Sequence, residues 1–354
     1  MILSTFKWPL GVTAAAFAAA FLIGGLPALS LVAILSILEI SLSFDNAVVN
    51  ATILERMSPY WQKLFLTIGI LIAVFGMRLL FPLLIVGITA HLNPVEAVSL
   101  ALKGGSVDEP GTYANLLQAA HPAIAAFGGM FLLLLFLDFV FEDREVSWLT
   151  WLERPLARIG KLDQLSVVVG LGALLAAAHL FGHTQTVLIA GILGALTYIL
   201  VGGLGELFEN ADSEEHLASG VPAGALATGK AAFFLFLYLE VLDASFSFDG
   251  VIGAFAITQN IFIIATGLGV GAMYIRSLTV FLVRKGTLAE YVYLEHGAMW
   301  AIGALACILL VSISYEVPEV ITGLIGVGFI GVAFASSVVN KRRSPETEPE
   351  LTGV

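Results

Sequence analysis

Charged residues are scarce in this chain. Only 12% of its 354 residues are Asp, Glu, Lys or Arg, whereas 58% are hydrophobic. Soluble domains carry about 25% charged residues, so this composition excludes an ordinary water-soluble enzyme or binding module. The alternating pattern of β-strands is also missing, which leaves helices to satisfy the backbone in lipid. The sequence therefore predicts an all-α integral membrane protein with the lipid bilayer as its surroundings.

Cysteine and excess positive charge are lacking as well. Cys307 is the only cysteine, so no intrachain disulfide can form, and its apolar surroundings indicate packing. Acidic residues outnumber Lys and Arg by 27 to 16, which gives a formal net charge of −11. This balance argues against nucleic acid as a partner and favours cations.

Long apolar runs are abundant instead. A helix needs about 20 apolar residues to cross a hydrocarbon core about 30 Å thick. The runs predict a single transmembrane domain, 1–354, of about ten transmembrane helices, at 8–25, 29–54, 63–90, 120–142, 164–181, 184–206, 229–255, 262–284, 294–314 and 319–339.

The distribution of Lys and Arg predicts the orientation in the membrane. Cytoplasmic loops hold most of the positive charge, and a cytoplasmic N-terminus leaves only Lys103 on the outer side. We therefore expect a multi-pass protein of the plasma membrane with both termini in the cytoplasm. A cleaved signal peptide at the first run is the alternative, but no clear small-residue cleavage site follows it. Segment 206–216 is predicted as an acidic cytoplasmic loop, and 341–354 as a disordered tail.

An acidic motif occurs twice inside apolar runs. The first copy reads Glu39-Ile-Ser-Leu-Ser-Phe-Asp45-Asn46, and the second reads Asp243-Ala-Ser-Phe-Ser-Phe-Asp249-Gly250. In both copies an Asp follows the first acid after six positions, with Ser, Ser and Phe in register. A carboxylate within a membrane span is costly, so matched acids at these positions indicate a functional site.

The similarity between the two parts of the chain continues beyond the acids. Each motif is followed by a Gly, by an Arg nine residues later, and then by a span that opens with His. The corresponding residues are Gly69, Arg78 and His121 in one half and Gly267, Arg276 and His296 in the other. A three-helix unit is therefore repeated, in halves 29–142 and 229–314, with a linking hairpin at 164–206. Since five predicted crossings separate the motif helices, we expect an inverted repeat with a shared site near the midplane.

The candidate ligands of that site are oxygen donors only. They are Glu39, Asp45, Asn46, Glu240, Asp243 and Asp249. Oxygen ligands without nearby Cys or His suit a hard divalent cation, and the sequence does not choose between Mn²⁺, Mg²⁺ and Ca²⁺. The alternative is a set of protonated, hydrogen-bonded acids with a structural role.

Ser and Arg residues are expected to support the site. Ser43 lies four positions after Glu39, so its hydroxyl shares a helix face with that acid, and Ser247 is its counterpart in the second copy. Arg78 and Arg276 lie within spans, where an unpaired guanidinium is costly. We expect both arginines to be counter-charges to the acids in one transport state, with snorkelling or a fixed structural ion pair as the alternative.

The second half carries two further recognisable stretches. Gly269 to Thr279 reads Gly-Val-Gly-Ala-Met-Tyr-Ile-Arg-Ser-Leu-Thr, and Tyr293 to Ala298 reads Tyr-Leu-Glu-His-Gly-Ala. With the acidic motifs, they make the chain resemble the TerC family of membrane proteins, and most closely a poorly characterised bacterial branch. The family motif Glu-x5-Asp-Asn falls on Glu39, Asp45 and Asn46, and the motif Glu-x2-Asp-x5-Asp falls on Glu240, Asp243 and Asp249.

The resemblance covers about residues 29–142 and 229–314. It implies a transporter of the wider LysE-like group, with manganese efflux as the typical activity and tellurium resistance as the historical association. One departure bears on the cargo, because Gly250 follows Asp249 where many relatives have Ser.

The leading hypothesis is a non-enzymatic exporter of a divalent cation, with Mn²⁺ favoured. Asp45 and Asp249 would lie on the pseudo-two-fold axis, with the other candidate ligands completing or gating the site. Proton exchange is a plausible energy source, because carboxylates that release a metal can take up protons. The alternatives are a membrane scaffold of a tellurium or stress-resistance complex without transport activity and, less favoured, an intramembrane aspartyl enzyme.

Overall fold

The computed structural model describes residues 2–144, 146–162, 164–218 and 226–343, and these ranges are helical throughout apart from short connections. They contain no β-strand, only an isolated bridge between Met57 and Ala227. The all-α prediction is confirmed. The helices are α1 (Ile2–Leu42), α2 (Phe44–Leu54), α3 (Pro59–Leu71), the π-helix η1 (Ile72–Leu80), α4 (Phe81–Thr89), α5 (Pro94–Lys103), α6 (Tyr113–Phe141), α7 (Thr150–Ile159), α8 (Leu165–Leu180), α9 (Thr184–Ala218), α10 (Gly229–Ile257), α11 (Ile261–Lys285), α12 (Thr287–Glu290), α13 (Leu294–Ser312) and α14 (Glu319–Arg343).

The chain is a multi-pass membrane protein by the length and composition of its helices. Among the described residues, seven helices are long and apolar enough to cross a membrane, namely Thr5–Leu42, Pro59–Thr89, Tyr113–Phe141, Thr184–Leu204, Ile261–Lys285, Leu294–Ser312 and Val320–Arg342. Their outer surfaces expose large apolar side chains; Ile23, for example, is 89% exposed. Such surfaces are typical of contact with lipid rather than water.

The sequence predicts about ten crossings, whereas seven described helices are long and apolar enough to span the membrane. Gly25 interrupts α1 with φ +67°, a conformation that Gly adopts without strain. This break lies at the end of the first predicted span, 8–25, and before the second, 29–54. Helix α8 is apolar but only 16 residues long. Ten crossings therefore stay a prediction.

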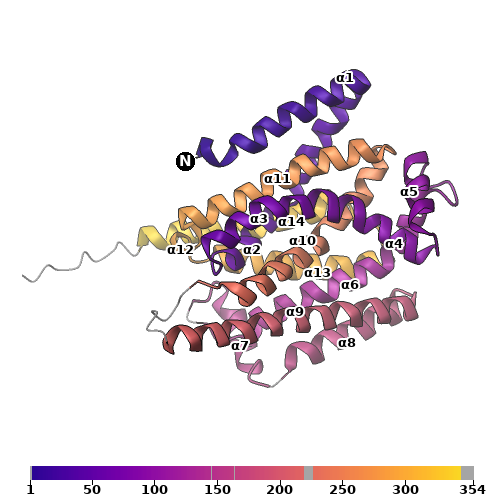
Figure 1. Ribbon diagram of the computed structural model, residues 1–354. Helices are drawn as coiled ribbons and strands as arrows, with labels where there is room; N and C mark the ends of the chain where they lie inside the picture. Colours follow the sequence, from indigo (N-terminus) through magenta and orange to yellow (C-terminus); the bar gives the residue numbers. More distant parts are fainter. Residues whose placement is uncertain (1, 145, 163, 219–225, 344–354) are drawn as a thin grey trace, which may run out of the picture.

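The long helices lie lengthwise beside one another (Figure 1). Helix α1 packs along α11, and α6 packs against both α9 and α13. Helix α10 contacts α6, α9 and α2, so the second acidic motif lies inside the bundle. Helices α5 and α12 lie at opposite ends of the bundle (Figure 1), which we call the α5 end and the α12 end.

Two predicted segment boundaries are wrong. The backbone of 206–216 continues α9, which runs to Ala218, so this acidic segment is helical and not a loop. Residues 341–343 likewise continue α14, and Lys341 forms an ion pair with Glu290 at 3.0 Å. The remainder of the predicted tail, 344–354, lies outside the described residues.

A buried carboxylate fixes the short helix α7 against the bundle at the α12 end. Glu153 Oε1 accepts a hydrogen bond from Trp300 Nε1 at 3.0 Å and lies 3.2 Å from His296 Nδ1, both on α13. Its second oxygen accepts the backbone N–H of Trp148 at 2.9 Å. Burial alone would raise the pKa of Glu153, but the hydrogen bonds from His296 and Trp300 outweigh it and lower this pKa from 4.5 to about 2.

We expect Glu153→Gln to destabilise the protein by about 1–3 kcal/mol at neutral pH, because the amide keeps only one acceptor oxygen and loses the negative charge, so a buried donor is left without an acceptor. The folded-state pKa lies below the unfolded value. The stabilisation is therefore complete above pH 4.5 and is lost as the pH falls towards about 2. Thermal unfolding of both proteins against pH measures this. Melting temperatures that differ by the same amount at pH 7 and at pH 3 would refute the assignment.

Candidate functional site

The first acidic motif lies where α1 gives way to α2. Ser43 separates the two helices, with φ −99° and ψ 17°. Its hydroxyl donates to Glu39 Oε1 at 3.1 Å, the contact that the spacing of four predicts. Because the chain starts a new helix at Phe44, Asp45 occupies a first helical turn, where a negative charge is favoured.

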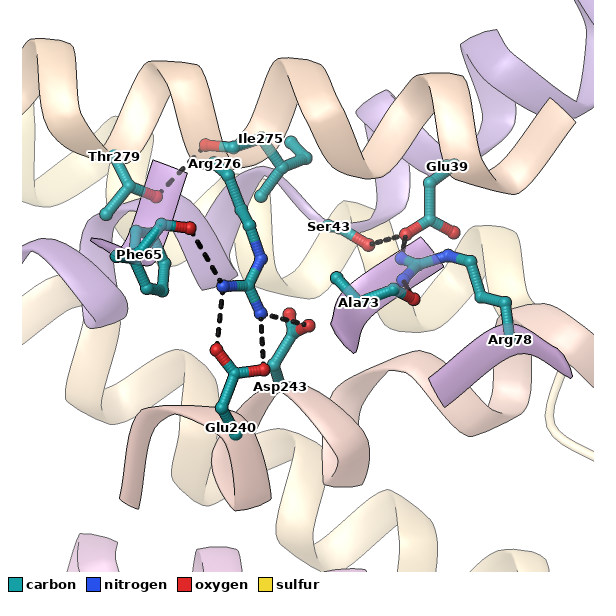
Figure 2. A network of polar contacts seen from close by, with 10 residues as sticks. All are labelled: Glu39, Ser43, Phe65, Ala73, Arg78, Glu240, Asp243, Ile275, Arg276 and Thr279. Carbon is teal, nitrogen blue, oxygen red and sulfur yellow. Dashed lines mark hydrogen bonds and ion pairs between the residues drawn. The ribbon is translucent and has the colours of Figure 1, made fainter. Parts of the chain in front are cut away.

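Glu39 also binds an arginine from the next apolar segment. Arg78 lies on η1, and π-helical segments of this kind are frequent at functional sites. Arg78 Nη2 donates to Glu39 Oε1, and Nη1 donates to the carbonyl oxygen of Ala73 at 2.7 Å (Figure 2). Both side chains are buried, so the pair is not a surface salt bridge.

The second acidic motif lies within the unbroken helix α10. Arg276, which is 1% exposed, reaches across from α11 and binds two acids of α10 (Figure 2). Its Nη1 and Nη2 each lie 2.9 Å from an oxygen of Glu240, and Nη2 also lies 3.1 Å from Asp243 Oδ2. The guanidinium stacks on the Phe65 ring, with Cζ 4.3 Å from the ring centre. This bidentate geometry gives a strong, fully desolvated pair.

The two ion pairs occupy corresponding positions in the two halves. Glu39 matches Asp243 in the aligned motifs, and Arg78 matches Arg276. Each arginine binds the first acid of the corresponding acidic motif, Glu39 or Asp243. Neither snorkels, because both guanidinium groups are buried.

A cavity of about 1260 Å³ opens between the loops of the α5 end and reaches the first motif. Glu39, Asp45 and Asn46 line its deep part, and Ser106, Asp108, Thr258, Asn260 and Glu316 line its walls. Among the described side chains, Glu240, Asp243 and Arg276 are not part of its lining. Phe246 and Gly250 of the second motif do line the cavity. The α5 end therefore reaches both motifs but, among the described side chains, only the acids of the first.

Sequence reasoning missed Asn50, one helical turn beyond Asn46 on α2. Asn50 is completely buried, and neither of its amide atoms has a hydrogen-bond partner among the described residues. The same holds for Asn46 Oδ1 and for Ser247 Oγ. Buried polar groups are normally paired with protein, water or an ion. The available signal was an Asn within the apolar stretch Val-Val-Asn-Ala that follows the motif.

The structure divides the predicted ligands into separate groups. Glu240 and Asp243 share Arg276, Glu39 binds Arg78, and Asp45 and Asn46 face the cavity. No three Asp, Glu, His or Cys side chains gather closely enough to hold a metal ion in the part of the chain that is described. The side chain of Asp249 lies outside that part, so its meeting with Asp45 stays a prediction.

A family-level match covers most of the chain. Residues 44–344 match a family described as protein of unknown function, DUF475. The chain belongs to the DUF475 family. The matched region begins directly before Asp45 and contains the whole second motif. No curated protein and no solved structure matches the chain.

Proposed function

We propose that this DUF475 protein is a membrane transporter that exports a divalent cation, with Mn²⁺ favoured over Mg²⁺ and Ca²⁺. The resemblance to TerC proteins is part of the proposal. The observation that carries it is the cavity that leads from the α5 end to buried carboxylates among apolar helices. Carboxylate, amide and hydroxyl oxygens of Glu39, Asp45, Asn46 and Ser43 are ligands that hard cations prefer.

The two halves are in unlike states in this conformation. Glu39 and Asp45 line the cavity, although Arg78 also binds Glu39. Glu240 and Asp243 are bound by Arg276 and do not line it. In the proposal the halves are inverted repeats that exchange these states, so that the site opens alternately to each side. The α12 end faces the cytoplasm, because Arg154, Arg158 and Lys285 belong to the basic residues that gather there.

The arginines supply the charge that a departing cation removes. Buried carboxylates are costly without a partner, so an empty site needs a positive group from the protein. Arg78 fills this role for Glu39. An arriving divalent cation would compete with Arg78 for Glu39 while Asp45 binds it directly. Protons that exchange for the metal would balance the remaining charge.

The activity is tested with purified protein in proteoliposomes. Fluxes of Mn²⁺, Mg²⁺, Ca²⁺ and Zn²⁺ are compared with those of protein-free vesicles. The proposal predicts flux of a hard cation, largest for Mn²⁺, and little for Zn²⁺. Folded protein that moves none of these ions would overturn it and favour the scaffold.

We expect Gly326→Ala to reduce cation flux about ten-fold or more without unfolding the protein. Gly326 on α14 faces Asp45, and an added Cβ would lie 2.8 Å from Asp45 Oδ2, so the carboxylate must move. Small displacements at a reacting or binding group have large effects on rate. Gly328→Ala is the matched control two residues away, because its Cβ would meet nothing within 4 Å. Equal flux in both variants would argue against Asp45 as a ligand.

A further inference from the structure

Helix α7 presents two unlike stripes to its surroundings. Trp151 and Ile159 on α7, and Leu162 just beyond its end, are exposed apolar side chains, with Trp151 74% exposed. Beside them lie Arg154 and Arg158, one turn apart. At 100° per residue, the apolar and basic groups form neighbouring stripes on one side of the helix. This pattern is typical of a helix that lies in the membrane interface.

The opposite side of α7 is fixed to the protein. Glu153 and Ala157 are buried, and Glu153 bonds to Trp300 and His296 of α13. The two stripes are therefore held in a set direction at the α12 end. They do not belong to a flexible loop.

A cavity of about 270 Å³ lies next to the basic stripe. Its basic lining residues are Arg144, Arg154, Arg158 and Lys161. Among the described residues, its acidic lining consists of Glu142, Asp143 and Glu153. Glu142 binds Arg144, and Glu153 binds side chains of α13. The ion pairs among the described residues do not include Arg154, Arg158 or Lys161, so the charges of these three side chains are available to a ligand.

We propose that this cavity binds the headgroup of an anionic phospholipid. The phosphate would contact Arg154, Arg158 and Lys161, since guanidinium groups bind phosphate oxygens in a bidentate manner. The acyl chains would lie along Trp151, Ile159 and Leu162. A free phosphate ion would leave this apolar stripe without a partner, and the combination of stripes therefore selects a lipid. The site is separate from the acidic motifs and does not depend on the proposed transport.

The test uses the full-length protein in neutral detergent micelles. Native mass spectrometry measures the binding of phosphatidylglycerol and of phosphatidylcholine. Each basic residue near a lipid headgroup contributes about five-fold in affinity, so Arg154→Gln with Arg158→Gln should weaken phosphatidylglycerol binding about 25-fold. Arg284→Gln with Lys285→Gln is the matched control, because it removes two exposed charges from the same end outside the cavity. This control should change binding less than about two-fold.

A charge-retaining pair, Arg154→Lys with Arg158→Lys, should keep most of the affinity and shows that the positions tolerate substitution. The proposal is overturned if the native protein binds the two lipids equally, or if the control pair loses as much affinity as the Arg154 and Arg158 pair. Displacement of phosphatidylglycerol by equimolar inorganic phosphate would also overturn it, since the site would then bind a free anion.

Discussion

Replacing Asp45 by Asn is expected to abolish cation flux and to leave the protein folded. Asp45 is 8% exposed and lies in the deep part of the cavity, and its Oδ1 accepts the N–H of Asn46 at 3.0 Å. Asn keeps the size and an acceptor oxygen but loses the negative charge that a divalent cation requires. Even residues that only orient metal ligands contribute about 10–100-fold, so we expect a loss of at least about 100-fold in flux.

Asp138→Asn is the matched control for this change. Asp138 lies on α6, is exposed and accepts a hydrogen bond from Tyr198, and it does not line the cavity. Its replacement should leave flux within about two-fold of the native rate. Flux assays run with equal amounts of monodisperse protein separate the two variants. Native flux from Asp45→Asn would remove Asp45 from the proposed site.

Arg276→Gln should destabilise the fold by about 3–5 kcal/mol, because it leaves two buried acids without a counter-charge. The pair is desolvated on all sides, and Arg276 itself is 1% exposed. Thermal unfolding and the yield of monodisperse protein measure the effect. Lys285→Gln, at the exposed end of the same helix, should be close to native.

A further variant separates the two possible causes of the lost stability, the unpaired charges of the acids and the lost packing of Arg276. Adding Glu240→Gln and Asp243→Asn to Arg276→Gln removes the unpaired charges while keeping the shapes of the acid side chains. The triple variant should therefore recover most of the lost stability. If the triple variant is no more stable than Arg276→Gln, the stability comes from the stacking of Arg276 on Phe65 of α3 rather than from its charge.

The general character of the fold and of the site could be predicted from the sequence. Apolar runs indicate membrane helices. Acids within these helices require partners with a positive charge, and Arg78 and Arg276 provide them. The Ser43 contact with Glu39 follows from a helical spacing of four. Each of these features depends either on residues that are close in the sequence or on the free-energy cost of an unpaired charge in lipid, which applies at every position in a span.

The difference between the halves could not be predicted. The stretches Ser-Leu-Ser-Phe and Ser-Phe-Ser-Phe are nearly identical, yet the first contains a helix break at Ser43 and the second lies in the unbroken helix α10. Tertiary packing decides between these outcomes. The cluster around Glu153 was missed for a similar reason, because His296 and Trp300 are more than a hundred residues away along the chain.

A cation site at Asp45 is tested by titrating the purified protein with Mn²⁺ and following the electron paramagnetic resonance signal of the free ion. We expect the native protein to bind Mn²⁺ saturably, Asp138→Asn to keep this binding and Asp45→Asn to lose it. Equal Mn²⁺ binding by the native protein and Asp45→Asn would contradict the claim that the cavity at Asp45 is a cation site.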